Sequence, residues 1–135
     1  MTHLPLKIVD VHDRGVPNYE RIVLTITEDT PLTNYFLGVG FARGLNHVLP
    51  INDNTFWFGA GVVNRGDWIF LYTGSGEPNS SKVPNQENEM YRLHWGRKGV
   101  LFSQEDIIPY LFEAVNIKLF QTPKTEISNA LRQIG

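Results

Sequence analysis

The sequence of 135 residues contains no cysteine and has little excess charge of either sign. Without cysteine there can be no disulfide bond, no thiolate zinc site and no cysteine nucleophile. The 12 Lys and Arg residues against 14 Asp and Glu residues leave a formal charge of −2. Binding to nucleic acid or to an anionic membrane calls for clustered excess Lys and Arg. We therefore predict neither nucleic acid nor a membrane as a partner.

Long hydrophobic runs are missing as well. The first ten residues lack the apolar stretch of a secretory signal, and no run approaches the roughly 20 apolar residues that span a bilayer. We expect a soluble protein, located in the cytoplasm because no signal peptide is visible. The length is close to the commonest domain size of about 100 to 150 residues. Residues 1–135 are therefore expected to form a single domain.

Strands are indicated by the alternation of apolar and polar residues. The clearest example is 20–28, where Ile22, Leu24 and Ile26 share one face, as in a half-buried strand. Trp68–Tyr72 is apolar on both faces, which is typical of a central strand covered on both sides. Further short strands are predicted at 6–12, 35–41, 47–49, 55–58, 90–95, 100–102 and 111–119. The residues 73–88 between two of these strands predict a long surface loop.

Helix signals are sparse. Ser103 can cap a short helical turn that Pro109 would end. A second helix is possible over 122–135, with a frayed tail as the alternative for that segment. About eight short strands with one or two helical turns predict an all-β fold, and specifically a single-domain antiparallel β-sandwich, immunoglobulin-like or related.

One family resemblance follows from short motifs in residues 20–75. Glu20 leads a strand, Leu32 and Tyr35 span a turn, Leu49 precedes a proline, and a Gly-led apolar strand follows Asn64. This order resembles that of lamin-tail-like domains, which are immunoglobulin-like β-sandwiches. The resemblance implies a structural or interaction module without a catalytic centre of its own.

Candidate catalytic and metal-binding residues are few. Asp10 and His12 are two residues apart, so on a strand they project from one face and could begin a metal site. An ordinary polar strand edge explains the same pair. The serines lack the Gly-x-Ser-x-Gly context of a nucleophile, and the adjacent acidic residues are typical of solvated positions. The sequence therefore contains no recognisable catalytic constellation, which leaves an enzyme as the weakest of the possible interpretations, and we expect no cofactor.

Aromatic residues provide the first group of binding candidates. Trp57 would point to the face opposite its neighbours Phe56 and Phe58, and Trp68, Phe70 and Tyr72 form an i, i+2, i+4 ladder. Exposed rings in such a line could stack on sugar rings. Alternatively, these rings belong to the core of a strand between two layers.

Cationic residues provide the second group. The strand 90–95 and the piece 100–102 predict a hairpin whose tip carries Arg97 and Lys98. With Arg92 and His94 pointing outward, the four residues would form a small basic patch for an acidic partner, or simply a solvated surface. We expect a non-catalytic module that makes protein contacts or self-associates, with carbohydrate binding by the aromatic residues as the alternative.

Overall fold

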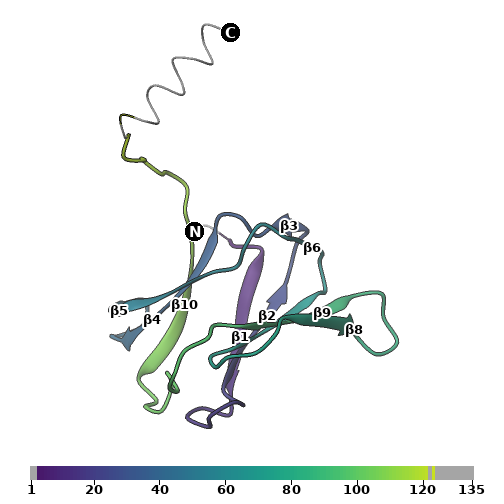
Figure 1. The fold of residues 1–135 in the computed structure, drawn as a ribbon, viewed down its shortest axis with the longest axis horizontal. Coiled ribbons are helices and arrows are strands. Elements are labelled where there is room, and N and C mark those ends of the chain that lie inside the picture. The colour runs from purple at the N-terminus through teal and green to yellow at the C-terminus, as the bar shows by residue number, and fades with distance from the viewer. Residues whose placement is uncertain (1–2, 122, 124–135) are drawn as a thin grey trace, which may run out of the picture.

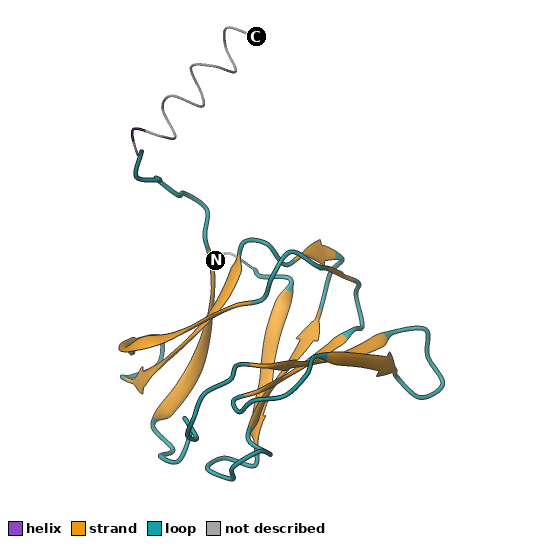
Figure 2. Ribbon diagram, in the orientation of Figure 1, coloured by secondary structure: helices purple, strands orange, loops and turns teal. Residues whose placement is uncertain are grey.

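The computed structural model describes residues 3–121 and residue 123, and the described chain is all-β (Figures 1 and 2). No helix lies between residues 3 and 121, and nothing in the described chain has the length and hydropathy of a membrane-spanning helix. Ten strands are present in this part of the chain. They are β1 (Leu6–His12), β2 (Arg21–Ile26), β3 (Thr30–Pro31), β4 (Tyr35–Ala42), β5 (Val48–Trp57), β6 (Val62–Val63), β7 (Trp68–Tyr72), β8 (Asn79–Lys82), β9 (Glu89–His94) and β10 (Ile107–Glu113).

The strands form three sheets. One has five strands in the order β1-β2-β7-β9-β8, one has three in the order β10-β4-β5, and β3 pairs with β6 in a short ladder. All neighbouring strands are antiparallel except β7 and β9, which are parallel. The prediction of a purely antiparallel arrangement was therefore wrong at this pair. A parallel pair needs a crossover, and β8 lies within the crossover that joins β7 to β9.

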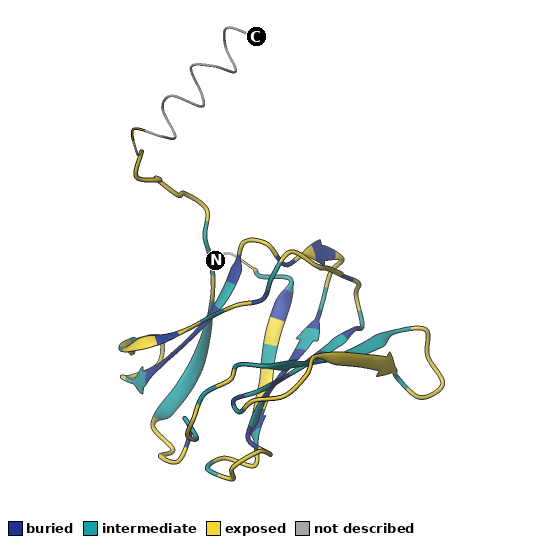
Figure 3. Ribbon diagram, in the orientation of Figure 1, coloured by how far each residue is buried: buried dark blue, intermediate teal, exposed yellow. Residues whose placement is uncertain are grey.

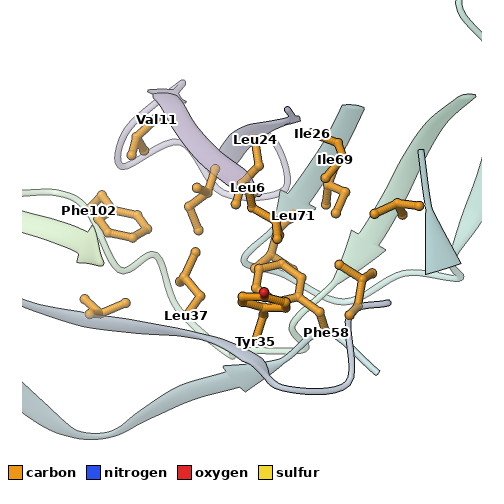
Figure 4. Packing of buried hydrophobic residues seen from close by; sticks show 14 residues of the cluster. Leu6, Val11, Leu24, Ile26, Tyr35, Leu37, Phe58, Ile69, Leu71 and Phe102 are labelled. Carbon is orange, nitrogen blue, oxygen red and sulfur yellow. The ribbon is translucent and has the colours of Figure 1, made fainter. Parts of the chain in front are cut away.

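The hydrophobic core contains residues from both larger sheets (Figure 4). Ile22, Leu24 and Ile26 of β2 supply one side, and Leu37 and Val39 of β4 supply the other. These residues recur at every second position because successive side chains of a strand point to opposite faces. Phe102, in the irregular segment between β9 and β10, is also fully buried in this core.

Several predicted elements differ from the structure. The pieces 47–49 and 55–58 belong to one strand, β5, whose pairing with β4 is interrupted by a bulge. Residues 100–102 form no strand, so the hairpin predicted around Arg97 and Lys98 is wrong. The turn at Ser103 is not helical. In residues 100–103 the backbone crosses from one sheet to the other. The Leu101 and Phe102 amides donate to the buried Glu20 carboxylate, where a hairpin would have used them to pair with a neighbouring strand.

The C-terminal strand also begins earlier than predicted. β10 covers 107–113 instead of 111–119, because pairing with β4 starts at Ile107, opposite Phe41. After Glu113 the chain continues in an irregular, mostly exposed segment that leaves the sheets (Figure 3). The possible helix over 122–135 lies outside the described residues, apart from residue 123.

Candidate functional site

The predicted aromatic ladder lies on the outer face of the five-stranded sheet. Ile69 and Leu71 of β7 are buried in the core, so Trp68, Phe70 and Tyr72 point to the opposite side. All three rings are half-buried. β7 is central in its sheet, as expected, but the expectation that both of its faces are covered was wrong. The ladder is therefore open to a ligand on this outer face.

Residues of β2 and β9 flank each ring of the ladder. Paired residues of neighbouring strands share a face, so each ring has one neighbour on either side. The register places Trp68 between Thr25 and Met90, Phe70 between Val23 and Arg92, and Tyr72 between Arg21 and His94. Val23 is buried although it does not belong to the core cluster, which is consistent with the rings covering it.

Ring stacking organises this surface. The Trp68 and Phe70 rings are nearly parallel, with centroids 6.4 Å apart and an interplanar angle of 12°. At the other end, Tyr72 stacks on the His94 imidazole at 5.1 Å and 18°. The Arg21 guanidinium lies 5.7 Å from the Tyr72 ring centroid, within the range of a cation–π contact. The ladder thus contains two stacked pairs, Trp68 with Phe70 and Tyr72 with His94, with a cation beside Tyr72.

An apolar hollow of about 290 Å³ adjoins the ladder. Its lining comes from four strands and from the end of the long loop: Val9, His12, Val23, Trp68, Phe70, Val83 and Met90. The residues 73–88 contribute in two ways, because Val83 forms part of this wall and Gly76 lies against the His94 ring. A Cβ at Gly76 would overlap that imidazole. This segment is not featureless, since β8 forms within it.

Polar side chains border the ladder on both sides. Arg92 Nη1 donates to Asn79 Oδ1 and to Ser81 Oγ, each at 3.1 Å, along the β8 side. On the β1 side, His12 Nε2 lies 3.5 Å from Asp10 Oδ2. These two metal candidates are thus adjacent, but no group of three His, Cys, Asp or Glu side chains among the described residues could hold a metal ion.

A buried carboxylate at Asp67 fixes the start of β7. Asp67 accepts hydrogen bonds from the Asn64 amide at 2.8 Å, the Glu89 amide at 3.0 Å and the Asn88 side chain at 3.0 Å. Burial by itself raises the pKa of Asp67, but the three hydrogen bonds to the ionised form outweigh burial and lower the pKa below its usual value. Asp67 therefore ties β7 to the first residue of β9.

A second buried carboxylate, Glu20, fixes the other end of the same sheet. Glu20 accepts bonds from the Gly15 amide at 2.7 Å and the Thr73 hydroxyl at 2.8 Å. It also accepts the Leu101 and Phe102 amides at 2.7 and 3.1 Å. Neither carboxylate was expected from the sequence to organise a site. The available signal was a lone acidic residue placed directly before an apolar strand, at both Glu20 and Asp67.

The remaining predicted site residues lie elsewhere. Arg97 Nη1 donates to the Asp53 carbonyl of β5 at 3.0 Å, so this guanidinium points to the other sheet, away from Arg92. Lys98 is exposed on the same loop. The expected basic patch of Arg92, His94, Arg97 and Lys98 is therefore divided between two places. Trp57 lies on the three-stranded sheet, 50% exposed, and its Nε1 donates to the Thr33 carbonyl at 2.8 Å.

A second group of rings, the aromatic row, crosses the outer face of the three-stranded sheet. Phe36 of β4 is paired with Trp57 of β5 on one side and with Phe112 of β10 on the other. Phe36 and Phe112 stack at 5.4 Å, and Phe112 and Tyr110 stack at 5.8 Å. Sequence reasoning missed this row, because its members come from three strands that are distant in the chain.

Comparisons with known proteins identify no relative. No family model matches the sequence, and neither a curated protein nor a solved structure shows significant similarity to it. A functional argument for this chain therefore depends on the surfaces described above.

Proposed function

We propose that this protein is a non-catalytic recognition module that binds carbohydrate through the outer face of its five-stranded sheet. The observation that carries the proposal is the half-buried ladder of Trp68, Phe70 and Tyr72 on the outer face, bordered by hydrogen-bonding side chains. A sugar ring has an apolar face that stacks on aromatic rings, and hydroxyl groups at its edge that need hydrogen-bond partners. The outer face offers both kinds of group side by side.

The placement of the polar groups supports a ligand that lies along the strand. Arg92 and Asn79 border the ladder on the β8 side, while Asp10 and His12 border it on the β1 side. Alternate residues of β7 are about 7 Å apart, so the ladder presents several stacking positions in succession. Both ends of β7 are held by buried carboxylates, which favours binding by a surface that is already ordered.

Binding to a glycan array, followed by titration of the best oligosaccharide, tests this proposal. Trp68→Ala should weaken binding at least about tenfold, as expected for the loss of one stacked ring. Trp57→Ala is the matched control, because it removes a tryptophan from the other sheet and should leave the affinity unchanged. An array without signal, or equal losses in the two variants, would contradict the proposal.

Protein contact is a second candidate function, and the aromatic row is the observation that favours it. Trp57 is 50% exposed and Phe112 is 36% exposed, and Phe36 lies between them. Contiguous exposed apolar surface is typical of protein-binding sites. Cross-linking in an extract of the native host should capture a protein partner. We expect the Trp57→Ser variant to lose this capture and the Trp68→Ala variant to keep it. The reverse pattern would reject the row as the contact surface.

We infer that the two larger sheets form an immunoglobulin-like β-sandwich, as in the lamin-tail-like domains that residues 20–75 resemble. The inclusion of residues from both sheets in one core cluster supports this arrangement. The test is an experimental structure whose strand order and sheet packing can be compared with that family.

A further inference from the structure

The segment after β10 has the features of a strand without a partner. Residues 114–121, here called the tail segment, run away from the sheets (Figures 1 and 2). Val115, Ile117 and Leu119 alternate with Asn116 and Lys118, the period expected of a strand with one apolar face. These three apolar side chains are 68–75% exposed. Within the described chain, the only backbone hydrogen bond of this segment joins the Ala114 amide to the Asn34 carbonyl.

The strand β5 has the complementary feature, an edge without a neighbour. β5 pairs with β4 on one side, and no described strand pairs with its other side. Edge strands are commonly protected by being short or by carrying lysine. β8, one of the two edges of the other sheet, is four residues long, polar, and ends in Lys82. β5 has ten residues, no Lys or Arg, and exposed Leu49 and Trp57.

Two features of β5 select where a strand could be added. Pro50 and the bulge with Asp53, whose φ is 64°, interrupt the first part of the edge, since proline and bulges disfavour pairing. The stretch beyond the bulge, Thr55–Trp57, pairs with β4 in a regular register. An added strand would bring backbone N–H groups to this stretch.

The charges of the two segments also match. Lys118 is the only charged residue of the tail segment, and Asp53 is the only charged residue of β5. The tail segment begins beside β4 and leads away from the sheets, while the β5 edge is on the far side of β4 from β10. A second copy therefore fits the geometry better than the chain's own edge.

We propose that the tail segment of one copy adds as a strand to the β5 edge of a second copy, next to Thr55–Trp57. Each copy carries one tail segment and one edge, so reciprocal addition closes a symmetric dimer. The three-stranded sheet of each copy would gain a fourth strand. This inference is independent of carbohydrate binding, which uses the other sheet.

Sedimentation of the full chain over a range of concentrations tests the proposal. The wild-type protein should form dimers, and Ile117→Lys should raise the dimer dissociation constant at least about tenfold, because it places a charge on the apolar face of the added strand. Asn116→Lys is the matched control, with the same new residue on the opposite face, and should have a much smaller effect. A chain that is monomeric throughout, or a dimer equally tolerant of both variants, would overturn the proposal.

Cysteine cross-linking gives a second, direct readout, because the natural chain has no cysteine. We expect the double variant Ile117→Cys with Thr55→Cys to form a disulfide-linked dimer on oxidation. Each single-cysteine variant should form much less of this species. A disulfide confined to the monomer mass would show that the tail segment returns to its own chain, and no disulfide at all would show that it does not reach β5. Either result would reject exchange between copies.

Discussion

The outer faces of the two larger sheets both carry a line of aromatic rings, but the residues around those rings differ. On the five-stranded sheet, Arg21, Arg92 and His94 lie directly beside the ladder. On the three-stranded sheet, Thr55, Gly38 and Tyr110 lie beside the row of Trp57, Phe36 and Phe112, and none of these three neighbours is charged. The first face can satisfy hydroxyl groups of a ligand, whereas the second offers mainly apolar contact. A line of rings alone therefore does not define the ligand.

The supports of the two faces differ as well. The five-stranded sheet is fixed at its two ends by the buried carboxylates of Glu20 and Asp67. On the three-stranded sheet, the Tyr110 ring lies against the backbone of Gly38. One face is therefore held by hydrogen bonds to charged groups, and the other by the close approach of a ring to the backbone. Each support can be removed separately.

The largest effect is expected from Glu20→Ala. The change leaves the Gly15, Leu101 and Phe102 amides and the Thr73 hydroxyl without their acceptor. Unsatisfied buried donors are costly, so the free energy of unfolding should fall by about 3–5 kcal/mol. Urea unfolding measures this loss. Glu113→Ala is the control on the other sheet, since Glu113 accepts one bond from the Tyr35 hydroxyl at 3.2 Å, and it should cost less than about 1 kcal/mol. Equal losses would remove the distinction between the two supports.

Gly38→Ala tests the support of the three-stranded sheet. A Cβ at this position would overlap the Tyr110 ring, so the ring must move and the free energy of unfolding should fall by about 1–3 kcal/mol. Gly99→Ala is the control, because Gly99 has open space around its Cβ position and no positive φ. The control should be neutral or stabilise the protein by up to about 1 kcal/mol. A tolerated Gly38→Ala would show that the aromatic row does not need this glycine.

The sequence was sufficient to predict the class of fold and several strands. The pattern of apolar residues placed the strand at 6–12 and the strand at 68–72 with the bounds that the structure has. It failed where tertiary contacts determine the backbone. Val100 to Phe102 looks like a strand by composition, but the amides of Leu101 and Phe102 bind Glu20 instead of a ladder partner. The parallel pairing of β7 with β9 leaves no local signal.

The candidate site was predictable only in part, for a similar reason. The ladder is local in sequence, so its common face followed from the spacing of Trp68, Phe70 and Tyr72. Whether that face is covered depends on how the sheets pack, and the spacing of residues along one strand does not determine that packing. Arg97 was expected at the tip of a hairpin, but its side chain donates to the Asp53 carbonyl, 44 residues away in the chain. Such long-range contacts divided the predicted patch.

Acid titration should distinguish the Asp67 support from the rest of the molecule. The folded-state pKa of Asp67 lies below that of the unfolded chain, about 3.9. Its contribution to stability is therefore complete above the unfolded pKa and is lost as pH falls through the folded pKa. At neutral pH, Asp67→Asn should cost about 1–2 kcal/mol, because the amide group cannot accept all three bonds. The difference between wild type and variant should shrink below pH 4. A constant difference, measured by urea unfolding at each pH, would contradict the assigned pKa direction.

The smallest change in stability is expected from Trp57→Phe, a variant that compares the two faces by the exposure of their tryptophans. Trp57 on the aromatic row is 50% exposed, whereas Trp68 on the ladder and Trp95 beneath the same sheet are half-buried. Trp57→Phe removes an exposed indole and its bond to the Thr33 carbonyl, which should cost about 0.5–1 kcal/mol. The same change should lower fluorescence quenching by acrylamide more than Trp68→Phe does. If carbohydrate binds the ladder, saturating ligand should protect the Trp68 signal and leave Trp57 accessible. Protection of Trp57 instead would move the binding site to the three-stranded sheet.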